Sequence, residues 1–370
     1  MAGLYVHIPF CKSRCVYCGF YSTTMYEMRQ KYVVALVDEL RLRRSYCDQR
    51  WHTVYLGGGT PSTLDASQLE MLFCAIDCSQ SKETTIECNP DDVTDEFVTV
   101  LKSLPVNRVS MGAQTFDDER LRFLRRRHSA CDVAKAVERL QKAGIDNISV
   151  DLMFGFPNET LDHWRSDVSQ ALSLGVQHIS AYSLMYEEGT PLYNMRERGV
   201  VREADEELTR SMYYMLKDRL ESAGYEHYEV SNFALPGRRA LHNSSYWTGV
   251  PYMGIGAAAH SYDGTTRQWN IEDVLIYINK VENNELPYTM ERLDLYERYN
   301  DMVMLALRTR EGVDMEVLSS RFGKDLSDYC LSAAGQFLTT GLLRLDGRRL
   351  RLTRDGLYVS DMIMSELMKV

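Results

Sequence analysis

The stretch HIPFCKSRCVYCGFYS, residues 7–22, carries three cysteines on one short segment. Cys11, Cys15 and Cys18 follow the spacing C-x3-C-x2-C. A cluster of four irons and four sulfurs normally takes one thiolate on each iron, so three thiolates leave one iron open to a further ligand. Half of a zinc site is the alternative, but zinc sites usually add a second pair of ligands downstream, and the chain has no second pair of this kind. We therefore predict a [4Fe-4S] cluster on these three cysteines.

The same spacing, with Tyr17 directly before the last cysteine, resembles the cluster motif of the radical S-adenosylmethionine superfamily. The resemblance implies that S-adenosylmethionine chelates the open iron through its amino and carboxylate groups. It also implies that an electron from the reduced cluster cleaves this cofactor to a 5'-deoxyadenosyl radical. In such systems the cofactor supplies the difficult chemistry, and the protein binds and orients it.

Length and composition limit the class of protein. The chain has 370 residues, which is enough for a large core and a second domain. Its formal net charge of -10 disfavours binding to the negatively charged backbone of nucleic acid. No apolar run has transmembrane length, and the start MAGLYVHIPF lacks the features of a signal peptide. Nine cysteines without a secretory signal favour reduced thiols. We expect a soluble, cytoplasmic protein with no nucleic-acid partner and no membrane span, and with at most peripheral membrane contact.

Short apolar runs alternate with helical patterns through the first half of the chain, which is typical of strand–helix units in a parallel sheet. The predicted strands are 4–8, 54–56, 85–88, 108–111, 148–153 and 178–183, and the predicted helices are 27–44, 66–76, 94–103, 131–143 and 161–174. Gly144 and Gly175 stand where helices end, as left-handed caps do. These units predict an α/β fold, a partial (β/α)6 radical SAM barrel.

The rest of the chain has a different pattern. The alternation stops near Leu184, and residues 233–262 read as loop with short strands. Near the C-terminus, Asp346-Gly347 separates two alternating runs, which is a strong hairpin signal. We expect a barrel core over 1–184, a barrel-associated extension over 185–290, and a C-terminal α+β, winged-helix-like domain over 291–370. In an acidic chain, that last module is expected to pack or to bind a protein partner, not DNA.

Conspicuous polar residues follow the predicted strands, at the end where parallel barrels gather functional groups. In the loop GGGTPS, residues 57–62, glycines let the backbone approach a ligand closely. A guanidinium can pair with the methionine carboxylate, and carboxylate or amide groups can bind the ribose diol. The superfamily resemblance implies that the cofactor is bound by Tyr17, Gly58, Gly59, Thr60, Glu87, Gln114, Arg126 and Asp151. For each of them, an ordinary capping or salt-bridging role is the alternative.

A narrower resemblance covers essentially the whole chain. The pattern YxHIPFCxxxCxYC from Tyr5 to Cys18, together with GGGTPS and the spacing to Gln114 and Asp151, is similar to the family of oxygen-independent coproporphyrinogen III oxidases and the related heme chaperones of the HemW branch. This resemblance implies that Tyr5 borders the cofactor on the side of the substrate.

Three features favour the chaperone branch. The oxidases carry a fourth cysteine two residues after the third, where this chain has Phe20, and they carry an N-terminal extension, whereas only four residues precede Tyr5 here. The run HNSSYW, residues 242–247, resembles the HNxxYW motif of the chaperones. Imidazole ligates iron and aromatic rings pack on a macrocycle, so His242, Tyr246 and Trp247 are candidate heme contacts. His260 is a second candidate, and a purely loop-holding role for His242 is equally open.

The sequence thus favours a [4Fe-4S] radical S-adenosylmethionine protein of tetrapyrrole metabolism, a heme chaperone that binds heme and passes it to an apo-protein. A reductant such as flavodoxin or ferredoxin would serve the cluster. The alternative is an oxygen-independent coproporphyrinogen III oxidase (dehydrogenase), which decarboxylates coproporphyrinogen III to protoporphyrinogen IX by means of the 5'-deoxyadenosyl radical. A radical enzyme acting on a substrate other than a tetrapyrrole is the third interpretation.

Overall fold

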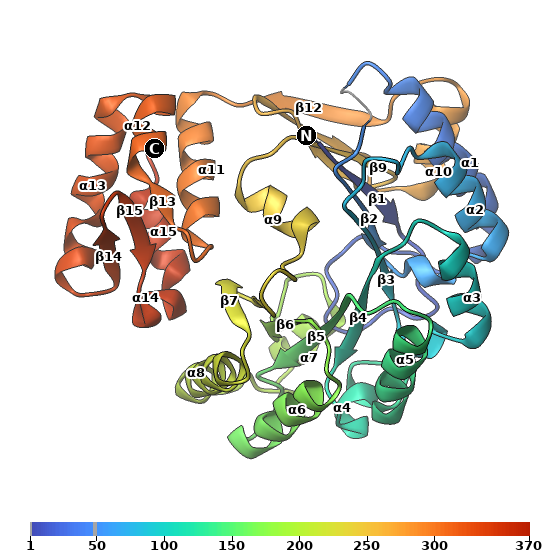
Figure 1. The fold of residues 1–370 in the computed structure, drawn as a ribbon, viewed down its shortest axis with the longest axis horizontal. Coiled ribbons are helices and arrows are strands. Elements are labelled where there is room, and N and C mark those ends of the chain that lie inside the picture. Colours follow the sequence, from blue (N-terminus) through green and yellow to red (C-terminus); the bar gives the residue numbers. More distant parts are fainter. Residues whose placement is uncertain (1, 47–49) are drawn as a thin grey trace.

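A strongly curved sheet dominates the computed structural model, which describes residues 2–46 and 50–370 (Figure 1). In the described residues this sheet has 12 strands in the order β12-β11-β10-β9-β1-β2-β3-β4-β5-β6-β8-β7. The strands β1 to β6 each pair in parallel with the next. They are Gly3–Ile8, Thr53–Gly58, Glu83–Cys88, Arg108–Gln114, Ile148–Phe154 and His178–Ser183. All six predicted strands are therefore present, and the sheet forms a partial barrel that does not close.

The helices that connect these strands cover the outer face of the sheet (Figure 1). They are α1 (Arg29–Leu42), α2 (Ala66–Ala75), α3 (Asp95–Ser103), α4 (Asp118–Phe123), α5 (Ala130–Lys142) and α6 (Leu161–Ser173), with 3-10 turns η1 (Tyr26–Met28), η2 (Pro61–Thr63) and η3 (Pro90–Asp92). Gly144 and Gly175 have φ angles of 86° and 64°, so both are left-handed caps as predicted. The sequence missed α4, a short helix whose first N–H groups donate to the Asp117 carboxylate.

Beyond β6, the chain adds strands to both edges of the same sheet. One edge receives β8 (Asn232–Ala234) and β7 (Glu226–Glu229), and the other receives β9 (Tyr252–Ile255), β10 (His260–Tyr262), β11 (Thr266–Asn270) and β12 (Tyr288–Arg292). The helices of this segment are α7 (Pro191–Glu197), α8 (Glu206–Ser222), α9 (Leu241–Trp247) and α10 (Val274–Glu282). Short strands were predicted over 233–262, but α9 was not. This helix lies between the sheet and the C-terminal domain (Figure 1).

A buried polar network fastens the added strands to the core. The carboxylate of Glu39, on α1, accepts hydrogen bonds from the Gly256 backbone N–H at 2.9 Å, from Asn270 at 2.8 Å and from the Tyr277 hydroxyl at 2.6 Å. It also pairs with Arg43 at 3.3 Å. Glu39 is fully buried, so these partners offset the cost of removing its charge from water. The network therefore fixes β9 to β11 and α10 against α1.

The C-terminal domain has its own hydrophobic core. Its elements are α11 (Leu295–Leu307), β13 (Val313–Asp314), α12 (Met315–Phe322), α13 (Lys324–Thr339), β14 (Leu343–Asp346), β15 (Arg349–Leu352), α14 (Arg354–Tyr358) and α15 (Ser360–Leu367). The predicted hairpin is present, because Asp346 pairs with Arg349 across a turn in which Gly347 has a φ of 59°. Helices and an antiparallel sheet of three strands make this an α+β unit.

Arg308, at the end of α11, ties this domain to the barrel. Its guanidinium donates to the buried Glu229 carboxylate of β7 at 2.8 Å and lies 4.9 Å from the centre of the Trp247 ring of α9. An ion pair and a cation–π contact thus join the two parts at one residue. In the part of the chain described, no helix combines the length and the apolar character needed to cross a bilayer.

Candidate functional site

A cavity of about 880 Å³ lies inside the curved sheet and extends to the carboxyl ends of its central strands. Except for the second heme candidate His260, every site residue predicted from the sequence lines it: Tyr5, Cys11, Cys15, Tyr17, Cys18, Gly58, Gly59, Thr60, Glu87, Gln114, Arg126, Asp151, His242, Tyr246 and Trp247. These residues come from segments far apart in the chain. The strand order brings them together because parallel strands present their carboxyl ends at one edge.

The three motif cysteines lie on the loop after β1 and are partly buried. Thr60 Oγ1 donates to Cys11 Sγ at 3.5 Å, and Arg126 Nη1 donates to Cys15 Sγ at 3.6 Å. Burial raises the pKa of the Cys18 thiol to about 11, so binding iron there must release a proton. Burial also raises the pKa of the Cys11 thiol, and the hydrogen bond from Thr60 opposes this shift. This donor set fits a cluster.

The geometry does not resemble a site for one metal ion. Within the described residues, no three histidine, cysteine, aspartate or glutamate side chains gather closely enough to bind a single ion. A [4Fe-4S] cluster takes each thiolate on a different iron, so its ligands need not converge on one point.

The glycines after β2 are needed for packing. A Cβ atom on Gly58 would lie 2.4 Å from the His7 ring, and Gly58 has a φ of 107°. A Cβ atom on Gly59 would lie 2.7 Å from the Pro9 carbonyl carbon. The loop can therefore pass close to the cysteine segment only without side chains at these positions.

The Glu87 carboxylate links two strands at the cavity wall. It accepts a hydrogen bond from the Tyr55 hydroxyl at 2.7 Å and another from the Gly58 N–H at 3.1 Å. Burial raises its pKa to about 7, so it exchanges a proton near neutral pH. Burial also raises the pKa of Asp151, whose carboxylate accepts from Ser110 Oγ at 3.4 Å.

Arg126 differs from the other basic residues around it. Its Nη2 donates to Asn89 Oδ1 at 2.7 Å and to the Gly112 carbonyl at 2.6 Å, while Nη1 points to Cys15. Arg125 and Arg127 on either side are exposed. Gln114, which ends β4, has a left-handed φ of 67°. Strain of this kind in a non-glycine residue is often found at ligand sites.

His242 is held by the protein itself. Its Nδ1 is 2.8 Å from Thr53 Oγ1, and its Nε2 is 2.8 Å from the Tyr246 hydroxyl. The ring is fully buried and stacks on Tyr55. Because both ring nitrogens are engaged, this arrangement favours the loop-holding role over the role of iron ligand.

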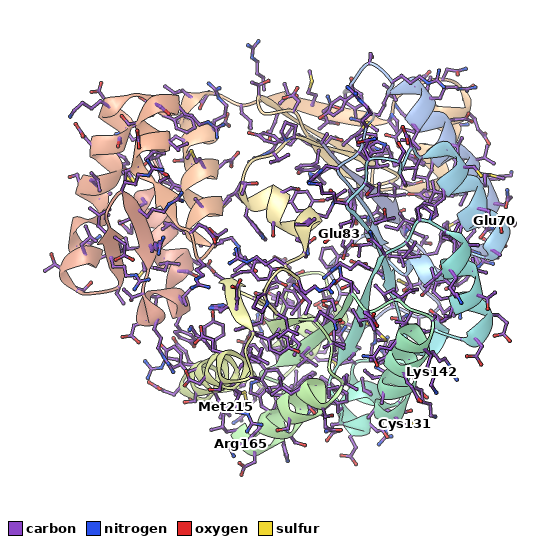
Figure 2. All side chains as sticks on the ribbon, in the orientation of Figure 1. Glu70, Glu83, Cys131, Lys142, Arg165 and Met215 are labelled. Carbon is purple, nitrogen blue, oxygen red and sulfur yellow. The ribbon has the colours of Figure 1, made fainter. Side chains whose placement is uncertain are left out.

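Glu83 fixes the start of α9. Its carboxylate accepts from the backbone N–H groups of Leu241 at 2.8 Å and His242 at 2.9 Å. Figure 2 shows Glu83 toward the middle of the molecule, whereas Glu70 and Lys142 lie at its surface. A carboxylate at a helix N-terminus is favourable, so β3 anchors the helix that carries the HNSSYW run.

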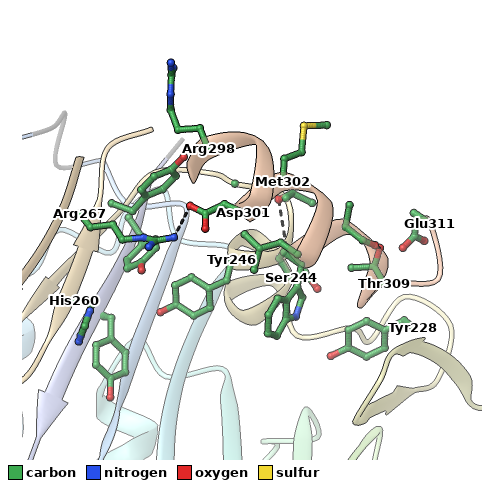
Figure 3. Close-up of a pocket in the computed structure, with 18 of the residues that line it drawn as sticks. Tyr228, Ser244, Tyr246, His260, Arg267, Arg298, Asp301, Met302, Thr309 and Glu311 are labelled. Atoms are coloured by element: carbon green, nitrogen blue, oxygen red, sulfur yellow. Dashed lines mark hydrogen bonds and ion pairs between the residues drawn. The ribbon is translucent and has the colours of Figure 1, made fainter. Parts of the chain in front are cut away.

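A second cavity, of about 990 Å³, lies between the sheet edge and the C-terminal domain (Figure 3). It shares Tyr5, Gly19, Phe20, Tyr246 and Trp247 with the first cavity. Its other walls include residues of α11 and the exposed His260 of β10, which stacks on Trp269. Arg267 of β11 forms an ion pair with Asp301 of α11 (Figure 3). Sequence reasoning missed this cavity because no motif links the extension to the C-terminal helices.

Comparison with known proteins agrees with this architecture. Residues 5–171 match the model of the Radical SAM superfamily, and residues 293–359 match that of the HemN C-terminal domain. A solved structure of the coproporphyrinogen III oxidase HemN from Escherichia coli shares the fold, with a TM-score of 0.85 and 20% sequence identity over 100% of this chain and 90% of that one.

The relatives found by sequence similarity indicate a narrower family. The heme chaperone HemW of Lactococcus lactis is 36% identical over 369 residues, which cover 98% of this chain and 96% of the relative. The heme chaperone HemW of Bacillus subtilis is 35% identical over 364 residues, which cover 96% of each. Because these relatives are 36% and 35% identical over almost the whole length, the chain belongs to the HemW family of radical S-adenosylmethionine proteins.

Proposed function

We propose that this protein is a heme chaperone, which binds heme and passes it to an apo-protein. The observation that carries the proposal is the pair of cavities that share Tyr246 and Trp247. One cavity contains the cysteines and suits the cofactor, and the other is large enough for a macrocycle beside aromatic side chains. Relatives named as heme chaperones over nearly the whole length support this assignment.

Cys11, Cys15 and Cys18 would hold the [4Fe-4S] cluster, which when bound supplies one-electron chemistry on S-adenosylmethionine. In this proposal, Arg126 pairs with the methionine carboxylate, because its guanidinium lies beside Cys15. Glu87, Gln114 and Asp151 serve the ribose hydroxyls, while Gly58, Gly59, Thr60, Tyr5 and Tyr17 shape the walls around the cofactor.

A reduced compartment and an electron donor complete the proposal. The eight cysteines in the described residues are all free, which supports a reducing environment such as the cytoplasm. A one-electron carrier such as flavodoxin or ferredoxin is proposed as the reductant.

Substitution of Arg126 by alanine is expected to weaken binding of S-adenosylmethionine by about 1.5–3 kcal/mol, the range for a hydrogen bond to a charged group. Isothermal titration of the anaerobically reconstituted protein measures this change. Arg122→Ala is the matched control, because Arg122 is exposed and belongs to the same basic run but does not line the cavity. Unchanged affinity in Arg126→Ala, with full iron content, would refute the role.

The heme is proposed to lie in the larger cavity, packed on Tyr246 and Trp247. His260 is the proposed iron ligand, because it lines that cavity and is exposed, whereas both nitrogens of His242 are already bonded. The sequence motif alone placed His242 before His260 as the candidate iron ligand. The proposal made here places His260 first.

The heme assignment is tested with two histidine variants. His260→Ala is expected to shift the Soret band of the heme complex and to lower heme affinity, with iron and sulfide of the cluster unchanged. His242→Ala is expected to lower the melting temperature and leave the position of the Soret band in place, since it breaks the bonds to Thr53 and Tyr246. A Soret band that moves in His242→Ala and not in His260→Ala would contradict the assignment.

A further inference from the structure

Arg108 is a buried guanidinium with unused hydrogen-bond donors. It is the first residue of β4, is 1% exposed, and lines the smaller cavity. Its Nε and Nη1 atoms are buried and have no hydrogen-bond partner among the described residues. Burying an arginine without bonded partners costs several kcal/mol, so a buried donor of this kind calls for an explanation.

The polar groups near Arg108 are already engaged with each other. The His178 ring bonds to Ser149 Oγ at 2.7 Å and to the Tyr228 hydroxyl at 2.7 Å, and the His242 ring bonds to Thr53 and Tyr246. Burial, helped by the positive charge of Arg108, lowers the pKa of both rings, so they stay neutral. Neither histidine therefore supplies a negative partner.

The nearby acids interact with Arg108 through space. Its charge lowers the pKa of Glu87 and Asp151 against the larger effect of burial, yet its Nε and Nη1 bond to neither carboxylate. Thr85, the register partner of Arg108 on β3, also has a buried hydroxyl without a partner. Arg108 and Thr85 therefore leave buried donors unpaired on two neighbouring strands.

Arg108 lies at the amino-terminal end of β4. The seven residues of β4 span roughly 20 Å at ~3.3 Å per residue, and Arg108 and Gln114 mark its two ends. Arg126 is the guanidinium beside Cys15. The proposed function assigns the methionine carboxylate to Arg126, which leaves the buried donors of Arg108 without an assigned ligand.

We propose that Arg108 binds a carboxylate of a ligand that reaches the deep part of the smaller cavity. A heme propionate is the source that the geometry favours, because Arg108 and His242 line the same cavity and His242 bonds to Tyr246, which lines both cavities. The methionine carboxylate of S-adenosylmethionine is the other source. The choice of heme rests on the proposed function, whereas the carboxylate site does not.

The test compares ligands with and without the carboxylate. Dissociation constants are measured for heme and its dimethyl ester, and for S-adenosylmethionine and its decarboxylated form, on the reconstituted parent protein and on Arg108→Met. We expect heme binding to weaken about ten- to hundred-fold in the variant, with the diester and both forms of the cofactor unchanged. Arg108→Lys, which keeps the charge, is expected to recover part of the heme affinity, and Arg122→Met is the matched control.

The outcomes separate the two proposals. Weakened binding confined to S-adenosylmethionine, with its decarboxylated form unaffected, would support the carboxylate site and assign it to the cofactor. The inference would be overturned if Arg108→Met bound heme and its dimethyl ester with equally reduced affinity. It would also be overturned if the variant kept its full affinity for both heme and S-adenosylmethionine. Failure of the parent protein to bind heme would contradict the proposed function. The comparison of S-adenosylmethionine with its decarboxylated form would then decide whether Arg108 binds a carboxylate.

Discussion

Replacing Cys11, Cys15 and Cys18 together by alanine is expected to abolish cluster binding. Each of the three thiols lines the same cavity, and each would hold a different iron. Anaerobic counting of iron and acid-labile sulfide after reconstitution measures the loss, with about four of each expected in the parent protein and none in the triple variant.

Cys88 provides the matched control for this experiment. It is buried at the end of β3 and also lines the cavity, but it is outside the motif. Cys88→Ala is expected to keep the full iron and sulfide content. A triple variant that still assembles a complete cluster would refute the assignment of the ligands.

Removing the Glu39 carboxylate is expected to cause a large loss of stability. Its network joins α1 to β9, β11 and α10, and Glu39→Ala would leave Arg43 buried without its acid. Breaking a buried pair in this way typically costs about 3–5 kcal/mol. The free energy of unfolding from urea denaturation measures the effect.

Two further variants complete that experiment. Glu39→Gln is expected to lose less stability, because the amide can still accept hydrogen bonds. Glu70→Ala, on the exposed face of α2, is expected to change the free energy of unfolding by no more than about 0.5 kcal/mol. A loss below about 1 kcal/mol in Glu39→Ala would show that the network contributes little.

Local sequence signals were sufficient for the barrel core. The six central strands are short and mostly buried, and each appears where the pattern predicted it. The cysteine spacing and the residues that follow each strand also predicted side chains that, except for His260, line one cavity. The parallel topology explains this result, because the carboxyl ends of parallel strands lie together at one edge of the sheet.

The parts that the sequence missed depend on contacts between distant segments. The helix α9 has only seven residues, and Glu83 of β3 fixes its start. No local sequence pattern therefore predicts this helix. A histidine beside aromatic residues fits a ligand or an anchor equally well until Thr53 and Tyr246 are found on its two nitrogens. Arg108 resembles any polar residue at the start of a strand until its side chain is found buried in the cavity wall.

The most direct measurement of function is a paired anaerobic assay on the reconstituted protein. One sample is titrated with heme, and the other receives coproporphyrinogen III, S-adenosylmethionine and a reductant. The chaperone proposal predicts saturable heme binding in the first sample and no protoporphyrinogen IX in the second. Efficient conversion of coproporphyrinogen III by the unmodified protein would contradict it.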